Sequence, residues 1–274
     1  MSPYLTFAHQ PQLMSEVFAT TLTGRRQLPW KRDGMTVLVI GARRGLGFEL
    51  TALMSRLHGD SVAATIRNLS DDGGLRALAP SPALYALDVR SVAQLSALVR
   101  ALEQCTTIQT LYYVSGVNAG TFADQYEINA RAPFRVIDAL LPRFARTGST
   151  LCMVNSLAGT SKQIAMFERA HFPMASARCD AASEPAGCAY KKSQKARNDA
   201  FRAREPFWRS RGVTAIAIHP GYMRTRMNNY TGKISARHSA EGIRRVCSTA
   251  AAVSRGPLGD AHSLLSWEGR RLPW

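Results

Sequence analysis

The feature that most constrains the fold is a glycine-rich turn between a short apolar run and an amphipathic segment. Residues 36–40 are mostly apolar and β-branched, which predicts a strand buried on both faces. Three closely spaced glycines follow: Gly41, Gly45 and Gly47. Residues 48–57 then predict a helix, and the apolar side chains expected on its buried side are Leu50, Leu53, Met54 and Leu57. A tight turn into a helix N-terminus leaves N–H groups unpaired at the positive end of the helix dipole, so this stretch predicts a phosphate site.

Further strands and helices alternate along the chain. The predicted strands are residues 36–40, 61–66, 83–87, 110–115, 150–155, 213–218 and a short one near 263–267. The predicted helices are residues 48–57, 92–102, 128–144, 190–211 and 240–252. This alternation indicates crossover units and predicts an α/β, Rossmann-type fold, a doubly wound parallel sheet in three layers. We expect a single domain over residues 35–274, preceded by an N-terminal extension, residues 1–34.

The net charge of +16 is spread unevenly along the chain. Residues 161–274 carry 20 basic and 8 acidic side chains, so they hold 12 of the 16 net positive charges. An enzyme acting on a small molecule does not need such a surface, whereas RNA, an anionic membrane face or an acidic protein would be attracted to it. A basic surface that only keeps the protein soluble is the alternative.

The N-terminal extension is basic and has no continuous apolar stretch, so it resembles an organelle-targeting segment more than a secretory signal. A segment that wraps the domain or a partner is the alternative. No apolar run approaches the roughly 20 residues that span a bilayer, and we expect no transmembrane segment. The five cysteines show no C-x-x-C spacing, which supports neither a metal site nor a disulfide framework and indicates a reducing compartment, the cytoplasm or the mitochondrial matrix.

Several short motifs follow the glycine-rich turn, whose spacing is G-x-x-x-G-x-G rather than the G-x-G-x-x-G of most dinucleotide dehydrogenases. In chain order the motifs are Gly41–Gly47, Asp88-Val89, Gly116, Asn129, Asn155-Ser156, Tyr190-Lys-Lys-Ser193, Pro220-Gly221 with Thr225, and the ending Gly269-Arg-Arg-Leu-Pro-Trp274. Together they resemble the short-chain dehydrogenase/reductase family over about residues 35–274, nearest to its carbonyl-reductase and C-signal-like subgroup. The resemblance implies the Rossmann-type fold and an oxidoreductase with a nicotinamide cofactor.

The residue at the end of the second strand bears on which nicotinamide cofactor fits. An NAD enzyme needs an acidic residue there to bind the ribose hydroxyls, and this chain has Arg67, with Arg44 in the glycine-rich turn. Two guanidinium groups suit the 2′-phosphate of NADP, although two ordinary surface arginines are the alternative. The resemblance implies this cofactor-binding set: Gly41, Arg43, Arg44, Gly45, Leu46, Gly47, Arg67, Asp88, Val89, Gly116, Tyr190, Pro220, Gly221 and Thr225.

For catalysis, the resemblance implies that Tyr190 exchanges a proton with the substrate oxygen, that Ser156 orients this oxygen and that Asn129 belongs to the same site. In the family, a lysine four residues after the tyrosine holds the ribose and lowers the pKa of the phenol. Here that position is Gln194, which is neutral. Lys195 is one residue further, but a helical step of about 100° turns it off this face.

Two further departures from the family pattern concern the segment Tyr113-Val-Ser before Gly116 and a lengthened stretch between Ser156 and Tyr190. Two interpretations follow. In the first, the protein is an NADP(H)-dependent enzyme that reduces a small-molecule carbonyl or oxidises an alcohol, with Lys195 or water replacing the lysine. In the second, it is a non-catalytic accessory subunit of a large protein or RNA–protein assembly, such as a mitochondrial ribosome or respiratory complex, bound through its basic C-terminal half.

Both interpretations leave a homo-oligomer open. The sequence also leaves open whether three aromatic residues line a pocket or pack in the core: Phe134, Phe167 and Trp208.

Overall fold

The computed structural model describes residues 36–104, 107–144, 148–161, 163, 188–253 and 264–274. The predicted N-terminal extension, most of the lengthened stretch between Ser156 and Tyr190, and Phe167 lie outside the described residues. Among the helices that the structure describes, none is both long and apolar enough to cross a membrane.

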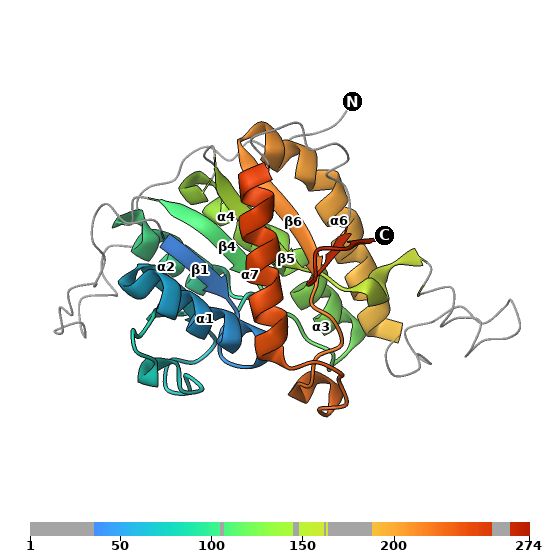
Figure 1. Ribbon diagram of the computed structural model, residues 1–274, viewed down its shortest axis with the longest axis horizontal. Helices are drawn as coiled ribbons and strands as arrows, with labels where there is room; N and C mark the ends of the chain where they lie inside the picture. Colours follow the sequence, from blue (N-terminus) through green and yellow to red (C-terminus); the bar gives the residue numbers. More distant parts are fainter. Residues whose placement is uncertain (1–35, 105–106, 145–147, 162, 164–187, 254–263) are drawn as a thin grey trace, which may run out of the picture.

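A single eight-stranded sheet runs through the middle of the described chain (Figure 1). Its strands are β1 (Thr36–Ile40), β2 (Val62–Ile66), β3 (Ala83–Ala86), β4 (Ile108–Tyr113), β5 (Ser149–Val154), β6 (Val213–His219), β7 (Leu264–Ser266) and β8 (Arg271–Leu272). They lie in the order β3-β2-β1-β4-β5-β6-β7-β8, and all neighbours are parallel except β7 and β8. The predicted doubly wound parallel sheet is confirmed, whereas the short antiparallel strand β8 was not predicted.

Helices cover both faces of the sheet, which gives the three predicted layers (Figure 1). The α-helices are α1 (Gly45–His58), α2 (Val92–Ala101), α3 (Phe122–Tyr126), α4 (Ala132–Phe144), α6 (Cys188–Ser210) and α7 (Ala236–Val253). A π-helical turn, η4 (Glu127–Arg131), joins α3 to α4. The 3₁₀ turns are η1 (Gly59–Ser61), η2 (Leu75–Ala77), η3 (Leu102–Gln104), η5 (Leu157–Gly159) and η6 (Arg226–Asn228).

The side chains of β1 alternate between two apolar cores. Val37 and Val39 pack with α1 and α7 on one face, while Leu38 and Ile40 pack with α2, α4 and α6 on the other. All four side chains are at most 5% exposed, as expected of a parallel strand covered by helices on both sides. The sheet is therefore rigidly held on both faces, and functional residues lie at its edge.

Three details differ from what the sequence predicts. Leu57 was expected to be buried but is 53% exposed, because the last turn of α1 borders an open pocket. The helix predicted over residues 128–144 is preceded by α3 and η4, so helical structure begins at Phe122. Cys188 forms a disulfide bond that its sequence spacing did not indicate, while Cys152 and Cys247 are free thiols.

Two of the aromatic residues that the sequence left open belong to the core. Trp208 of α6 is fully buried, and its ring stacks on Phe134 of α4 at a centroid distance of 6.2 Å and an interplanar angle of 8°. Phe201 meets the same indole edge-on at 5.5 Å. The three rings attach α6 to α4, so they set the position of the helix that carries Tyr190.

We expect Trp208→Ala to lower the free energy of unfolding by about 3–5 kcal/mol, because it leaves a large cavity beside two aromatic rings. The neighbouring Phe207 is 46% exposed, so Phe207→Ala is the matched control, with an expected loss of about 1 kcal/mol or less. Urea unfolding followed by circular dichroism measures both. Equal losses in the two variants would contradict the assigned core.

Candidate functional site

The order of the strands puts a topological switch point at the carboxyl ends of β1 and β4. The chain leaves β1 for β2 and β3 on one side and continues with β4, β5 and β6 on the other. Such a switch point opens a crevice between the two loops that follow the central strands. Gly41 follows β1 and Ser115 follows β4, and a Cβ at Gly41 would lie 2.9 Å from the Ser115 nitrogen. The backbone of these two loops is therefore in direct contact.

The glycine-rich turn accepts side chains at none of its three glycines without strain. Gly41 and Gly45 have φ angles of +91° and +56°, and a Cβ at Gly47 would lie 2.1 Å from the Gly41 carbonyl oxygen. Arg44 precedes α1 and makes no side-chain hydrogen bond that caps the helix. The N–H groups of the first turn are thus available to an anion. Leu46 is buried in the core and positions this turn by packing.

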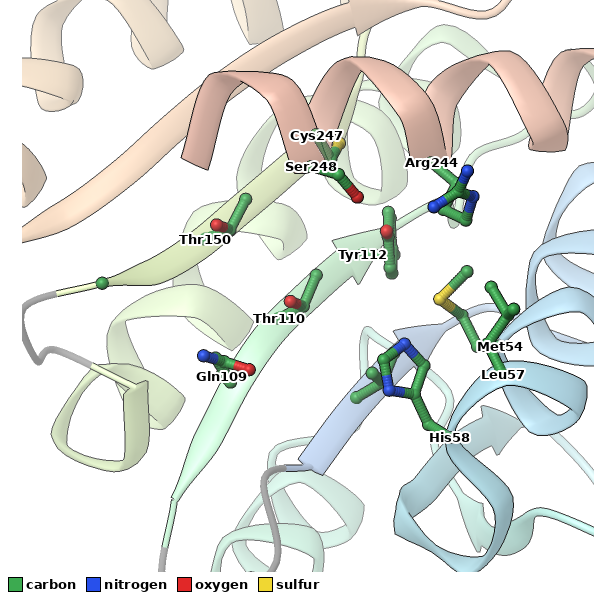
Figure 2. Close-up of a pocket in the computed structure, with 12 residues that line it drawn as sticks. Met54, Leu57, His58, Gln109, Thr110, Tyr112, Thr150, Arg244, Cys247 and Ser248 are labelled. Atoms are coloured by element: carbon green, nitrogen blue, oxygen red, sulfur yellow. The ribbon is translucent and has the colours of Figure 1, made fainter. Parts of the chain in front are cut away.

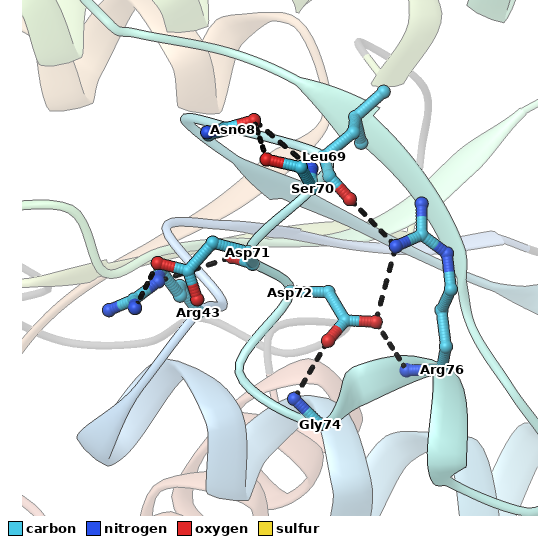
Figure 3. Close-up of polar contacts among 8 residues, drawn as sticks. All are labelled: Arg43, Asn68, Leu69, Ser70, Asp71, Asp72, Gly74 and Arg76. Carbon is cyan, nitrogen blue, oxygen red and sulfur yellow. Dashed lines mark hydrogen bonds and ion pairs between the residues drawn. The ribbon is translucent and has the colours of Figure 1, made fainter.

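Four arginines gather around the start of α1. Burial lowers the pKa of Arg44, and the charges of Arg226, Arg43 and Arg67 lower it further. Arg43 is itself paired with the Asp71 carboxylate, and its Nε donates to the Asp71 carbonyl at 3.2 Å (Figure 3). Cations that repel one another in this way are stabilised by a bound anion. Arg226 was not predicted, although it directly follows a predicted residue, Thr225.

The loop that carries Asp71 is held by its own hydrogen bonds (Figure 3). The Asp72 carboxylate accepts from the backbone nitrogens of Gly74 at 2.9 Å and Arg76 at 3.2 Å, and these bonds lower the pKa of Asp72. The loop therefore holds Asp71 in place as the partner of Arg43, which leaves Arg44 and Arg67 as the nearer cations for an external anion.

Asp88 and Val89 lie in the loop after β3. The Asp88 carboxylate accepts from Arg90 at the backbone nitrogen (3.0 Å), at Nε (3.1 Å) and at Nη2 (2.9 Å). The side-chain hydrogen bond from Arg90 is the main reason why the pKa of Asp88 is lowered. Val89 is buried, and its carbonyl accepts from Arg135 Nη2 at 2.9 Å. Asp88 is thus charged at neutral pH and oriented by its own loop.

The loop after β6 reaches back to the start of α1. Gly221 has a φ of +79°, and a Cβ there would lie 2.8 Å from Trp267 Nε1. The Pro220 carbonyl accepts from the Ser239 hydroxyl at 2.7 Å. With this loop anchored, Thr225 Cγ2 lies 3.7 Å from where a Cβ of Gly45 would be. The structure thus brings together the predicted residues that follow β1 and β6.

Ser156 and Tyr190 meet at the ends of β5 and α6. Ser156 follows β5, Tyr190 lies in the first turn of α6, and the Ser156 side chain is close enough to affect the pKa of the Tyr190 phenol. Burial raises the pKa of Tyr190, while Ser156 and the charge of Arg197 act in the opposite direction. A protonated phenol is therefore the resting form at neutral pH, and it can donate a proton.

Asn129 connects the loop after β4 to the same helix. It is fully buried in η4, and its Nδ2 donates to the Val117 carbonyl at 2.8 Å and to the Ser193 hydroxyl at 3.0 Å. Its Oδ1 accepts from the Val117 nitrogen at 2.8 Å and lies 3.3 Å from where a Cβ of Gly116 would be. The π-helical turn thus aims Asn129 inward, and Gly116 leaves room for it.

Gln194 and Lys195 do not supply a charge to Tyr190. Gln194 is 3% exposed and neutral, and its backbone lies against η5, since a Cβ at Gly159 would be 2.4 Å from the Gln194 carbonyl carbon. Lys195 is paired with Asp199 through a 2.6 Å contact on the exposed side of α6. This contact on the exposed side of α6 gives no support to the hypothesis that Lys195 replaces the missing lysine.

Sequence reasoning missed one residue beside this site, Arg197. It is 2% exposed and lies close enough to Tyr190 to lower the pKa of its phenol. The sequence could have indicated Arg197 by its position seven residues after Tyr190. Residues about two helical turns apart lie on the same face of a helix.

A pocket of about 390 Å³ lies away from these residues, between α1 and α7 over β4 and β5 (Figure 2). Its lining includes His58, Tyr112, Arg244 and Cys247. None of the predicted site residues lines it. The predicted residues instead gather at the opposite, carboxyl edge of the sheet.

Comparison with known proteins gives consistent matches. The model of the short chain dehydrogenase family matches residues 35–168. The C-signal protein of Myxococcus xanthus is 26% identical over 160 residues, which cover 58% of this chain and 81% of that protein. NADPH-bound carbonyl reductase from chicken fatty liver superposes with a TM-score of 0.72 at 21% identity, covering 88% of this chain and 99% of the other. A carbonyl reductase of Pseudomonas aeruginosa PAO1 in complex with NADP gives 0.67 at 24%, covering 88% and 100%.

The burial of His219, a histidine beside Ser156, can be tested by the pH dependence of stability. His219 ends β6, its Nδ1 accepts from the Leu157 nitrogen at 3.3 Å, and burial lowers the pKa of His219 to about 4. The unfolded histidine titrates near pH 6.5, so the unfolded chain binds the proton first as the pH falls. The stability that His219 contributes is complete above about pH 6.5 and is lost as the pH falls toward 4.

We expect the free energy of unfolding of the wild type to fall relative to that of His219→Gln by up to about 1.4 kcal/mol per pH unit between pH 6.5 and 4. The glutamine carbonyl can still accept from Leu157 but does not titrate. Urea unfolding at several pH values measures the difference, and parallel pH curves for the two proteins would contradict the burial of His219.

Proposed function

Because the chain belongs to the short-chain dehydrogenase/reductase family, we propose that it is an NADP(H)-dependent oxidoreductase that reduces a carbonyl group or oxidises an alcohol. The observation that carries this proposal is that Ser156 and Tyr190 come together at the carboxyl edge of the sheet, the same edge at which the glycine-rich turn lies. The carbonyl reductases that share the fold support the same class of reaction.

The residues present fit a dinucleotide with a 2′-phosphate. At Gly41 and Gly47 the backbone of the turn approaches its neighbours so closely that no side chain fits, and α1 begins there without a side-chain cap. Arg67 directly follows β2, where an NAD enzyme would need an acid, and its charge acts on Arg44. The turn would hold the pyrophosphate, and Arg44 and Arg67 the 2′-phosphate.

The bound nicotinamide supplies or accepts the hydride. The chain supplies the proton and the orientation of the substrate oxygen. Because burial raises the pKa of Tyr190, its phenol carries a proton at neutral pH and gives it to the oxygen of a carbonyl that Ser156 holds by a hydrogen bond. This protonation state favours reduction over oxidation near pH 7.

Tyr190→Phe removes the proton donor and leaves the ring in place. We expect kcat/KM for the reduction of quinones or aldehydes by NADPH to fall by about 10²–10⁴-fold, with a far smaller change in NADPH affinity. The absorbance of NADPH follows turnover, and its fluorescence follows binding. Undiminished turnover in this variant would remove Tyr190 from the mechanism.

Arg67→Asp tests the choice of cofactor. Loss of a charge-assisted contact with the 2′-phosphate costs about 1.5–3 kcal/mol, so NADPH affinity should fall roughly 10- to 100-fold and NADH affinity far less. Arg56→Asp is the matched control, since it makes the same change of charge on the last turn of α1. Equal weakening of NADPH and NADH by Arg67→Asp would refute the 2′-phosphate assignment.

A second candidate function, a non-catalytic accessory subunit of a large assembly, is favoured by the buried neutral Gln194 at the position of the family's lysine. In that case the Tyr190→Phe protein would sediment with the same large particle as the wild type. Ribonuclease treatment would then separate an RNA–protein assembly from a protein one.

A further inference from the structure

Arg197 and Tyr190 lie on the same face of α6. The two residues are seven positions apart, which is almost two full turns, so their side chains leave the helix in nearly the same direction. Side chains on a helix lean toward its N-terminus, and a long arginine therefore extends back toward Tyr190. Each side chain affects the pKa of the other, which places the guanidinium and the phenol within electrostatic reach.

The guanidinium of Arg197 lies under the loop that follows β4. Its Nη1 donates to the Ser115 carbonyl at 3.3 Å and lies 3.7 Å from where a Cβ of Gly116 would be. Its Cζ lies 5.2 Å from the centroid of the Tyr113 ring. Ser115 also borders Gly41 of the glycine-rich turn, so the guanidinium lies behind the loop that contacts this turn.

Two hydrogen-bond donors of this buried cation are unused. Arg197 is 2% exposed, and its Nε and Nη2 have no hydrogen-bond partner among the described residues. Among the described residues no carboxylate acts on its pKa, and its neighbours Tyr113 and Tyr190 are phenols that stay protonated at neutral pH. A buried charge without a carboxylate partner is costly, and a side chain that only filled the core would be better apolar. The free donors point to a ligand with oxygen acceptors.

We propose that Arg197 does the work of the lysine that is missing at position 194, an inference that rests on the proposed oxidoreductase function. Its guanidinium supplies the positive charge that acts on the Tyr190 phenol, and its free N–H groups bind the hydroxyls of the nicotinamide ribose. Arg197 therefore touches the cofactor, and it acts on the proton transfer through Tyr190.

The other groups around Tyr190 leave this task to Arg197. Ser156, from the end of β5, donates or accepts a hydrogen bond but carries no charge. His219, from the end of β6, is neutral at pH 7 because its pKa is lowered to about 4. On α6 itself, Gln194 is neutral and Lys195 is paired with Asp199. Among the described residues, Arg197 is the cation that lowers the pKa of Tyr190.

The test compares Arg197→Met, Arg197→Lys and the double variant Arg197→Met with Gln194→Lys. Two quantities are measured: NADPH affinity by fluorescence, and the titration of the Tyr190 phenol by ultraviolet difference spectra against the same protein carrying Tyr190→Phe. Thermal melting identifies the variants that fold. If Arg197→Met does not fold, Arg197→Lys still tests the role of the guanidinium, because it keeps the positive charge.

We expect Arg197→Met to weaken NADPH binding at least tenfold and to move the phenol titration to higher pH. Arg197→Lys should restore part of both effects, and a lysine at position 194 in the double variant should restore most of both. If Arg197 has only a structural role, a lysine at position 194 will not restore NADPH affinity or the phenol titration. Failure of the double variant to restore both would therefore overturn the proposal. Unchanged NADPH affinity and phenol titration in folded Arg197→Met would overturn it as well.

Failure of the proposed function gives a different result. A wild type that binds NADPH but turns over no carbonyl would refute the oxidoreductase function, while the two measurements on the Arg197 variants would still decide the role of Arg197.

Discussion

Close backbone contact between the start of α1 and the end of β1 determines where the glycine-rich turn directs its N–H groups. A Cβ at Gly47 would come within 2.1 Å of the Gly41 carbonyl oxygen, so α1 rests directly on the strand that leads into it. This contact aims the helix N-terminus at the switch point between β1 and β4, where the order of the strands already opens a crevice. The arginines and the loop after β6 then gather around a site whose backbone is fixed.

A second close contact brings the proton-transfer residues together. Gly159 of η5 allows α6 to approach until a Cβ there would lie 2.4 Å from the Gln194 carbonyl carbon. Asn198 strengthens this contact, since its Nδ2 donates to the Ser156 carbonyl at 3.1 Å and its Oδ1 accepts from Asn155 at 2.9 Å. Ser156 is thus held against α6, the helix that carries Tyr190, by backbone and amide contacts.

The sequence predicted the sheet and the elements that carry the site, because burial on both faces of β1 and the glycine spacing are local patterns. It could not predict Arg226 beside Arg44, since that contact depends on how the loop after β6 folds back over α1. It missed Arg197 for a different reason. The family's lysine is expected four residues after the tyrosine, whereas Arg197 lies seven residues after it, on the same face of the helix.

Two departures of this chain from the family pattern, at Tyr113 and Gln194, are both connected with Arg197. Tyr113 replaces a polar residue of the family motif, and its ring lies 5.2 Å from the Arg197 guanidinium. An aromatic face stabilises a desolvated arginine, and it does so without neutralising the charge as a carboxylate would. A lysine at position 194 would add a second cation to the same buried space, where like charges repel strongly. A neutral Gln194 avoids that repulsion, so with the proposed role of Arg197 the same residue that favours the accessory subunit also fits an enzyme whose charge has moved along the helix.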